Sequence, residues 1–97
     1  MTLHQYKNLV ISKSSCPYCV KAKAILDQRG VDYVTLSLDS DLDKATMVEF
    51  IADIANVVVN TVPQIILDGR YVGGHDDLVA MLEKTSLADD TFSDFEL

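Results

Sequence analysis

The chain has few cysteines and few basic residues, on which several common classes of protein depend. Its 97 residues include only two cysteines, which stand close together, so a disulfide framework of the secreted kind is excluded. Basic residues are also scarce, since eight Lys and Arg stand against fifteen Asp and Glu and the net charge is −7. This charge argues against the basic surface that nucleic-acid binding needs and against attraction to anionic lipid.

Long apolar runs are missing as well. No stretch approaches the roughly 18 unbroken apolar residues of a membrane span, and the apolar run near the N-terminus is too brief for a secretory signal. The 48% of hydrophobic residues that are present suit one globular core in a chain of this length. We therefore expect a single domain that is monomeric and cytoplasmic, with no membrane or nucleic-acid partner.

Hydrophobic periodicity predicts that strands and helices alternate along the chain. Residues 8–12 form a short run with a β-branched centre, which is typical of a buried strand. A helix should follow from Pro17, which suits a first turn, to Gly30, which suits a helix stop. We expect Val20, Ala24 and either Leu26 or Ile25 to recur on the apolar face of this helix.

The middle of the chain continues the same alternation. Residues 31–38 alternate apolar and polar side chains as a half-buried strand does, which completes a βαβ unit. Residues 39–55 predict a second helix, because Asp residues open it and apolar residues recur at helical spacing. The Asp68–Gly69 turn signal then joins strands at 64–67 and 70–72 into an antiparallel hairpin.

The C-terminal part should begin as a helix and end as a tail. Residues 75–84 predict the helix, because two Asp residues stand near its start and apolar residues follow on one face. The residues after it show no sustained period, so we expect no regular structure there. They are acidic, with four Asp and Glu and no base in the last nine positions. We therefore divide the chain into a domain at 1–86 and an acidic C-terminal tail at 87–97.

Both cysteines lie in a C-x-x-C motif where the first strand gives way to the first helix. Cys16 would precede the helix and face its unpaired N–H groups and positive dipole end, with Lys13 and Lys21 as further sources of positive charge. Such surroundings lower the pKa of a thiol from about 8.5 to between roughly 3.5 and 7.5. Cys16 is therefore expected to be a nucleophile at neutral pH. Cys19, expected to be more buried, would attack the resulting mixed disulfide.

Two other interpretations of the cysteine pair stay open from the residues alone. A zinc site needs two more ligands, and the only histidines, His4 and His75, do not form a ligand-spaced pair, so we expect no metal. A pair of buried, inert cysteines is the stronger alternative. A C-x-x-C motif beside a βαβ pattern is nevertheless more typical of redox chemistry.

Three motifs occur together, namely "CPYC" at 16–19, "TVP" at 61–63 and "GGHDDL" at 73–78. Their order and approximate spacing resemble the dithiol glutaredoxin family over about residues 8–84. The resemblance implies an α/β protein with a thioredoxin-like fold, in which about three helices flank a four-stranded mixed sheet. It also implies a glutathione-dependent thiol–disulfide oxidoreductase, with Cys16 and Cys19 in the roles given above and glutathione as co-substrate.

The resemblance assigns the binding of glutathione to further residues. Thr61, Val62 and a cis Pro63 would form a loop in which the Val62 backbone pairs with the cysteine of glutathione, as an added strand does. From the residues alone, an ordinary trans Pro at a strand edge is the alternative. Tyr18 would form a wall of the site and Lys13 would meet the glycine carboxylate. A surface aromatic and a solvated lysine are the corresponding alternatives.

The third motif implies the other end of the glutathione site. Gly74, His75 and Asp76 would bind the γ-glutamyl end, because helix N–H groups suit its carboxylate and Asp76 can accept from its α-ammonium group. Plain helix capping by Asp76 or Asp77 is the alternative. His75 stands where the family commonly has Cys, Ser or Thr. Its imidazole could respond near pH 6.5, although an exposed His that contributes its backbone is favoured.

The resemblance also implies partners. Disulfide-bonded or glutathionylated proteins would be the substrates, and glutathione reductase would act indirectly by regenerating glutathione. Asn60 stands where a base is common, so binding of the glycine carboxylate should depend more on Lys13 and be weaker. The acidic "DDTFSDFEL" is similar to the C-terminal docking peptides of ribonucleotide reductase small subunits, which makes that enzyme a candidate partner. A solubilising tail is the favoured alternative.

Two other functions stay open. One is a glutaredoxin-like redoxin that takes electrons from thioredoxin reductase, and the other is a non-catalytic module that binds a partner or an iron–sulfur cluster. The "TVP" and "GGHDDL" motifs favour glutathione over thioredoxin reductase, and a resolving Cys19 argues against the cluster role.

Overall fold

The computed structural model describes residues 3–90, with the side chains of His4 and of residues 84–90 excepted. Its elements in chain order are a short 3-10 helix η1 (Leu3–Gln5), β1 (Leu9–Ser12), α1 (Pro17–Gln28), β2 (Val34–Ser37), α2 (Lys44–Ala55), β3 (Gln64–Leu67), β4 (Arg70–Gly73) and α3 (His75–Asp90). Apart from η1, this is the order of strands and helices that the sequence predicts. No helix within residues 3–90 is long and apolar enough to cross a membrane.

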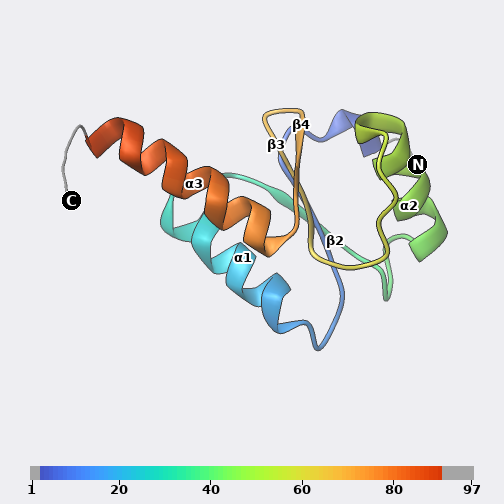
Figure 1. Ribbon diagram of the computed structural model, residues 1–97. Coiled ribbons are helices and arrows are strands. Elements are labelled where there is room, and N and C mark those ends of the chain that lie inside the picture. Colours follow the sequence, from blue (N-terminus) through green and yellow to red (C-terminus); the bar gives the residue numbers. More distant parts are fainter. Residues whose placement is uncertain (1–2, 91–97) are drawn as a thin grey trace.

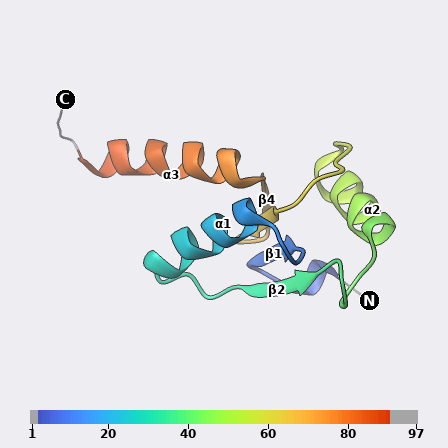
Figure 2. The same ribbon diagram turned by 90° about the horizontal axis from the view of Figure 1, so that it is seen from below.

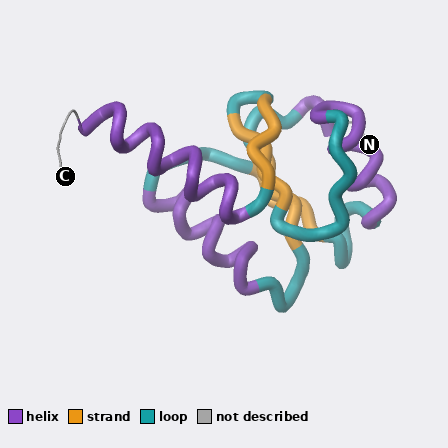
Figure 3. The backbone as a smooth tube through the Cα atoms, in the orientation of Figure 1, coloured by secondary structure: helices purple, strands orange, loops and turns teal. Residues whose placement is uncertain are grey.

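The four strands form one mixed sheet in the order β2-β1-β3-β4 (Figure 3). β1 pairs in parallel with β2 and antiparallel with β3, and β3 pairs antiparallel with β4. A parallel pair needs a crossover connection, which α1 provides. The predicted βαβ unit and the predicted hairpin are both confirmed. At the hairpin turn Asp68 and Gly69 have φ of 55° and 76°, the positive values that a two-residue turn requires.

The helices cover both faces of the sheet. Figures 1 and 2 show α1 and α3 side by side on one face and α2 on the other. Each face has its own apolar core. The α1/α3 side buries Val10, Ala22, Leu26, Ile65 and Leu78, and the α2 side buries Leu3, Leu9, Ile11, Leu36, Leu42, Met47, Phe50, Ile51 and Ile66. β1 contributes to both cores because its successive side chains point to opposite faces.

The buried face of α1 agrees with the prediction at Leu26 and differs from it at Val20 and Ala24. Its buried residues are Cys19, Ala22 and Leu26, whereas Val20 is 63% exposed and Ala24 is exposed. Both sets recur at helical spacing, and the two stripes lie next to each other on the helix. Because Cys19 belongs to the buried stripe, the second cysteine is part of the packing of α1.

The last helix is longer than the sequence predicts. α3 continues to Asp90, so the expectation that regular structure ends near residue 84 was wrong. Residues 85–90 contain Leu and Ala and neither Gly nor Pro, so nothing in them breaks a helix that is already formed. The proposed domain boundary after residue 86 therefore falls inside a helix. The end of the acidic tail, residues 91–97, lies outside the described residues.

Candidate active site at the cysteine pair

The cysteine pair lies at the junction between β1 and α1. Cys16 and Cys19 form a disulfide with a Cα–Cα distance of 5.2 Å. Cys16 is 8% exposed and Cys19 is 1% exposed, so the first sulfur is the more accessible one. The structure thus places the two cysteines in the relation expected of an outer thiol and an inner thiol.

Cys16 is the N-cap residue of α1. Its Sγ accepts a hydrogen bond from the backbone N–H of Cys19 at 3.2 Å, and Pro17 follows at the first helical position. Proline suits that position because its missing N–H would have no partner within the helix. The first turn of α1 holds no acidic residue. A negative charge on Cys16 would therefore meet a helix N-terminus with an N–H group aimed at the sulfur.

The loop before β3 approaches the same sulfur. The Val62–Pro63 peptide bond is cis, as the resemblance implies. The carbonyl oxygen of Val62 lies 3.9 Å from Cys16 Sγ, although 46 positions separate the two residues. Pro63 is buried and Val62 half-buried, so this loop presents backbone beside the reactive pair.

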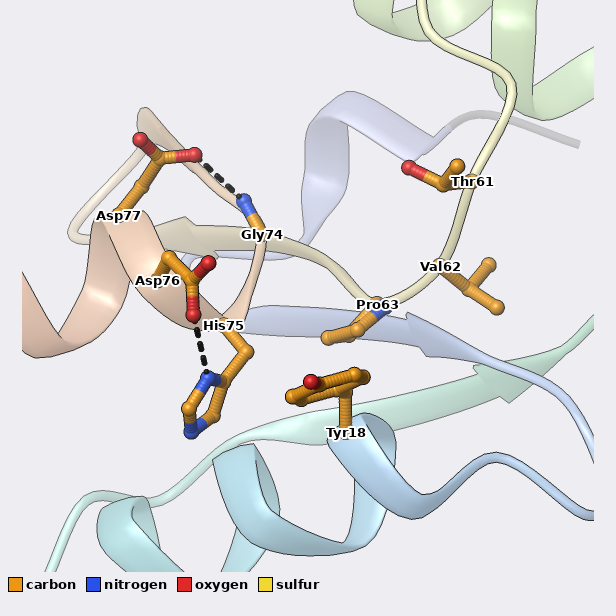
Figure 4. A pocket seen from close by; sticks show the side chains of 8 residues that line it. All are labelled: Tyr18, Thr61, Val62, Pro63, Gly74, His75, Asp76 and Asp77. Atoms are coloured by element: carbon orange, nitrogen blue, oxygen red, sulfur yellow. Dashed lines mark hydrogen bonds and ion pairs between the residues drawn. The ribbon is translucent and has the colours of Figure 1, made fainter.

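A pocket of about 360 Å³ lies between this loop and the two helices (Figure 4). Three parts of the chain line it, namely Tyr18 in α1, Thr61, Val62 and Pro63 in the loop, and Gly74, His75, Asp76 and Asp77 at the start of α3. Seven of these eight residues are ones that the sequence predicts for the site, and the fold brings them together from three separate motifs.

The two carboxylates at the start of α3, Asp76 and Asp77, make different contacts. Asp77 accepts a hydrogen bond from the backbone N–H of Gly74 at 3.0 Å, which is the reciprocal half of a capping box. Asp76 does not cap the helix, and its carboxylate lies 3.0 Å from His75 Nδ1 with the Asp76 side chain 96% exposed. One of its oxygens is thus engaged and the other is free to accept. Asp77 is the residue of this pocket that the predicted site omitted.

Tyr18 is held at the pocket by two neighbours. Its ring centroid lies 5.3 Å from that of His75 at a tilted angle, and Lys21 Nζ lies 5.2 Å from the Tyr18 centroid. The Tyr18 side chain is 55% exposed, yet a ring and a cation restrain it. These contacts link α1 to the start of α3 across the pocket.

Among the residues predicted to bind glutathione, Lys13 is the one that does not line this pocket. It precedes Ser14, whose backbone N–H donates to Asp39 Oδ2 at 2.5 Å. That hydrogen bond is the largest cause that holds the pKa of Asp39 below its ordinary value, and the charge of Lys13 adds to the effect. The sequence reasoning missed Asp39, because 25 positions separate it from Ser14 and no local pattern marks the contact.

Among the residues that the structure describes, no group of three or more His, Cys, Asp and Glu could hold a metal ion. The reactive groups of the described site are its two sulfurs. Cys16, the more exposed of the two cysteines, can attack a disulfide from its position at a helix N-terminus, and Cys19 on the same helical turn can close a disulfide with it.

Comparisons with known proteins agree with this geometry. The family model described as Glutaredoxin matches residues 8–72. Glutaredoxin-1 of Rhizophagus irregularis is 39% identical over 80 residues, which cover 82% of this chain and 77% of that protein. Glutaredoxin 3 of Escherichia coli (strain K12) is 38% identical over 72 residues, which cover 74% of this chain and 81% of that protein.

Solved structures support the same relationship. A buckwheat glutaredoxin–glutathione complex superposes with a TM-score of 0.72 at 27% identity and covers 89% of this chain and 76% of that chain. A dithiolic glutaredoxin from Trypanosoma brucei brucei gives a TM-score of 0.70 at 29% identity and covers 89% and 87%. The thioredoxin-like fold that the sequence motifs imply is therefore confirmed.

Proposed function

The chain belongs to the glutaredoxin family of thiol oxidoreductases, and from that premise we propose that it reduces protein disulfides and glutathione mixed disulfides with electrons from glutathione. The observation that carries the proposal is the position of Cys16. Its sulfur lies at the N-terminus of α1, 3.2 Å from the Cys19 backbone nitrogen and 3.9 Å from the Val62 carbonyl oxygen.

Reduction of a protein disulfide proceeds by two exchange steps. The Cys16 thiolate attacks one sulfur of the substrate, which forms a mixed disulfide and expels the other substrate sulfur as a thiolate. The Cys19 thiolate then attacks Cys16 Sγ, which releases the reduced substrate and leaves the Cys16–Cys19 disulfide. The substrate has gained two electrons and the cysteine pair has lost them. The structure contains the pair in this oxidised form.

Glutathione restores the thiols by two further exchanges. One glutathione thiolate attacks Cys16 Sγ and frees Cys19. A second attacks the glutathione sulfur of that mixed disulfide, which releases oxidised glutathione and the Cys16 thiolate. With a glutathionylated protein, the Cys16 thiolate attacks the glutathione sulfur and expels the protein thiolate, which gives the same Cys16–glutathione mixed disulfide. This reduction therefore needs no Cys19. The two substrate classes should therefore depend differently on the second cysteine.

We assign the glutathione site to the pocket beside Cys16. The Val62 backbone at the cis proline would pair with the glutathione cysteine, and Tyr18 would cover it. The N-terminus of α3 would bind the γ-glutamyl carboxylate, and the free oxygen of Asp76 would accept from the α-ammonium group. A complex of a similar buckwheat glutaredoxin with glutathione supports this assignment. Lys13 is assigned to the glycine carboxylate from its motif position alone.

The test is glutathione-dependent reduction of a small glutathione mixed disulfide, coupled to NADPH through glutathione reductase. We expect Cys16→Ser to abolish turnover and Cys19→Ser to retain most of it. A wild-type protein that is inactive with glutathione but is turned over by thioredoxin reductase would contradict the proposal in favour of a redoxin. Glutathione-dependent visible absorbance of the purified protein would instead favour the iron–sulfur module.

A cytoplasmic location and ribonucleotide reductase as a substrate are further proposals that rest on the sequence. The acidic end of the chain motivates the second one. Deletion of residues 91–97 should weaken the binding of ribonucleotide reductase and leave turnover of the small mixed disulfide unchanged. Equal binding of the reductase by the full and shortened chains would remove the acidic end from this role.

A further inference from the structure

Asp39 is a surface carboxylate that contacts the loop carrying the nucleophile. It lies in the turn after β2, and its Oδ2 accepts from the Ser14 backbone N–H at 2.5 Å and from Ser37 Oγ at 3.3 Å. The Ser37 hydroxyl in turn accepts from the Asp39 backbone N–H at 3.1 Å. The carboxylate thus has a fixed orientation with respect to its own turn and reaches across to another segment.

The turn that carries Asp39 is anchored independently of this contact. The Leu38 backbone N–H donates to the Ser12 carbonyl at 2.8 Å, which continues the pairing of β1 with β2. Asp41 closes the turn by accepting from the Ser37 backbone N–H at 2.8 Å. Asp39 therefore projects from a framework that the sheet holds in place.

The loop that Asp39 contacts is a short connection between two regular elements. It consists of Lys13, Ser14 and Ser15 between the end of β1 and the N-cap Cys16. Ser15 has a φ of 56°, a left-handed conformation that a non-glycine residue keeps only where its surroundings enforce it. The hydrogen bond from the Ser14 N–H to Asp39 can enforce this conformation, because it fixes the residue before Ser15. Ser14 lies two positions before Cys16.

The contact is a charge-assisted hydrogen bond. The Ser14 N–H is the largest cause that holds the pKa of Asp39 below its ordinary value, so the carboxylate is ionised at neutral pH. Hydrogen bonds to ionised acceptors are shorter and stronger than neutral ones. The positive charge of Lys13 lies near the same carboxylate and compensates it.

We propose that Asp39 is a positioning residue, whose carboxylate fixes the loop before Cys16 by accepting the Ser14 N–H and thereby holds the Cys16 sulfur at the N-terminus of α1. The inference rests on the proposed function in one respect, namely that Cys16 is the nucleophile. It does not depend on glutathione as the reductant. Loss of the contact would let the loop leave its conformation, and the sulfur would lose its alignment with the Cys19 N–H.

The test is the pH dependence of Cys16 alkylation by iodoacetamide in the reduced full chain, with the modified cysteine identified by peptide mass spectrometry. Asp39→Ala removes the charge and the acceptor, whereas Asp39→Asn removes the charge and keeps an acceptor oxygen. The difference between the two variants therefore isolates the hydrogen bond. Asp43→Ala is the control, since it removes a carboxylate of the same segment whose hydrogen bond is to the Thr46 N–H in α2.

We expect the alkylation midpoint of Asp39→Ala to lie about 0.5 above that of Asp39→Asn, which lowers the thiolate fraction about threefold below the midpoint. Asp43→Ala should follow the wild type. Equal midpoints in Asp39→Ala and Asp39→Asn would overturn the proposal, because both variants lack the charge and only Asp39→Asn keeps the acceptor oxygen.

A second measurement covers the case in which Asp39→Ala does not fold. In the wild-type protein, the Ser14 amide proton resonance should move with pH as the Asp39 carboxyl titrates below pH 3.8, its ordinary value. A Ser14 resonance that does not follow the Asp39 carboxyl overturns the proposal without any variant. Neither measurement contains glutathione, so a failure of the glutathione assay leaves both results interpretable.

Discussion

The N-termini of α1 and α3 both border the same pocket, yet they begin in different ways. α1 is capped by the sulfur of Cys16 and has no acidic residue in its first turn. α3 has Asp76 and Asp77 in its first turn, and Asp77 accepts from the Gly74 N–H. Both helices present the positive end of a dipole. In α1 the negative charge that this dipole would stabilise is the thiolate of Cys16.

The positive end of a helix dipole has a different role at each of these two helices. A carboxylate in the first turn of α1 would compete with the thiolate for the helix N–H groups and would repel it. At α3, where a bound carboxylate is proposed, Asp77 takes one N–H and leaves the following amides of the first turn without intrahelical partners. The first turn of α3, where binding of a carboxylate is proposed, therefore contains acidic residues, whereas the first turn of α1 contains none.

The largest effect on this comparison is expected from Gly73→Ala. Gly73 has a φ of 123°, and an added Cβ would lie 2.3 Å from Asp77 Oδ2, so the change strains the backbone and displaces the cap. We expect a loss of about 2–4 kcal/mol in the free energy of unfolding by urea. The KM for glutathione should also rise, because the N-terminus of α3 is disturbed.

Gly69→Ala is the matched control for this change. Gly69 also has a positive φ, of 76°, but an added Cβ would meet no atom within 4 Å. Its cost should be limited to the left-handed backbone, about 1–2 kcal/mol, with no change in KM. Equal losses in the two variants would show that the contact with Asp77 contributes nothing to the effect.

A smaller effect is expected when an acid is added beside the reactive thiol. Val20 is 63% exposed in α1, so Val20→Glu brings a negative charge near Cys16 without a packing cost. Like charges at positions i and i+4 repel by about 0.2–0.5 kcal/mol, so the alkylation midpoint of Cys16 should move up by about 0.1–0.4. Val20→Gln is the neutral control. Displacement of the glutamine variant as far as the glutamate variant would rule out charge as the cause.

Much of this comparison could be predicted from the sequence, because it depends on local patterns. The C-x-x-C motif before a helix, the Asp68–Gly69 turn and the two acids after a glycine pair each act over a few positions. The predictions failed where the deciding contact is distant or where two local patterns compete. Val20 and Cys19 begin neighbouring stripes with the same spacing, and packing against the sheet and α3 selects the stripe of Cys19.

The contacts that hold the site together are the part that sequence reasoning could not supply. Asp39 meets Ser14 only because β1 and β2 lie in parallel, which brings the two strand ends together. Lys13 was assigned from its motif position, and the same contact places it beside a carboxylate outside the pocket lining. Such pairings depend on the register of strands, which no pattern in either segment reveals.

The smallest effect on the chemistry is expected at the third helix N-terminus, that of α2, which does not line the pocket. Asp43 caps it by accepting from the Thr46 N–H at 2.8 Å. Hydrogen bonding from the Thr46 side chain, followed by this backbone hydrogen bond, holds the pKa of Asp43 below its ordinary value. Asp43→Ala should therefore lower the urea midpoint at pH 7 and leave Cys16 alkylation unchanged. Asp43→Asn should come close to the wild type, because Asn caps helices as well.

The pH dependence of the stability lost in Asp43→Ala tests whether the lost interaction is capping by an ionised carboxylate. Because the folded-state pKa of Asp43 is depressed, its ionised carboxylate contributes stability above the ordinary pKa of 3.8, and the contribution is lost as pH falls through the lower folded-state value. The difference in urea midpoint between wild type and Asp43→Ala should therefore be full at pH 7 and shrink below pH 3.8. A difference that stays constant into acid would contradict a charged cap. A change in Cys16 alkylation in Asp43→Ala would contradict the expectation that the N-terminus of α2 does not influence the pocket.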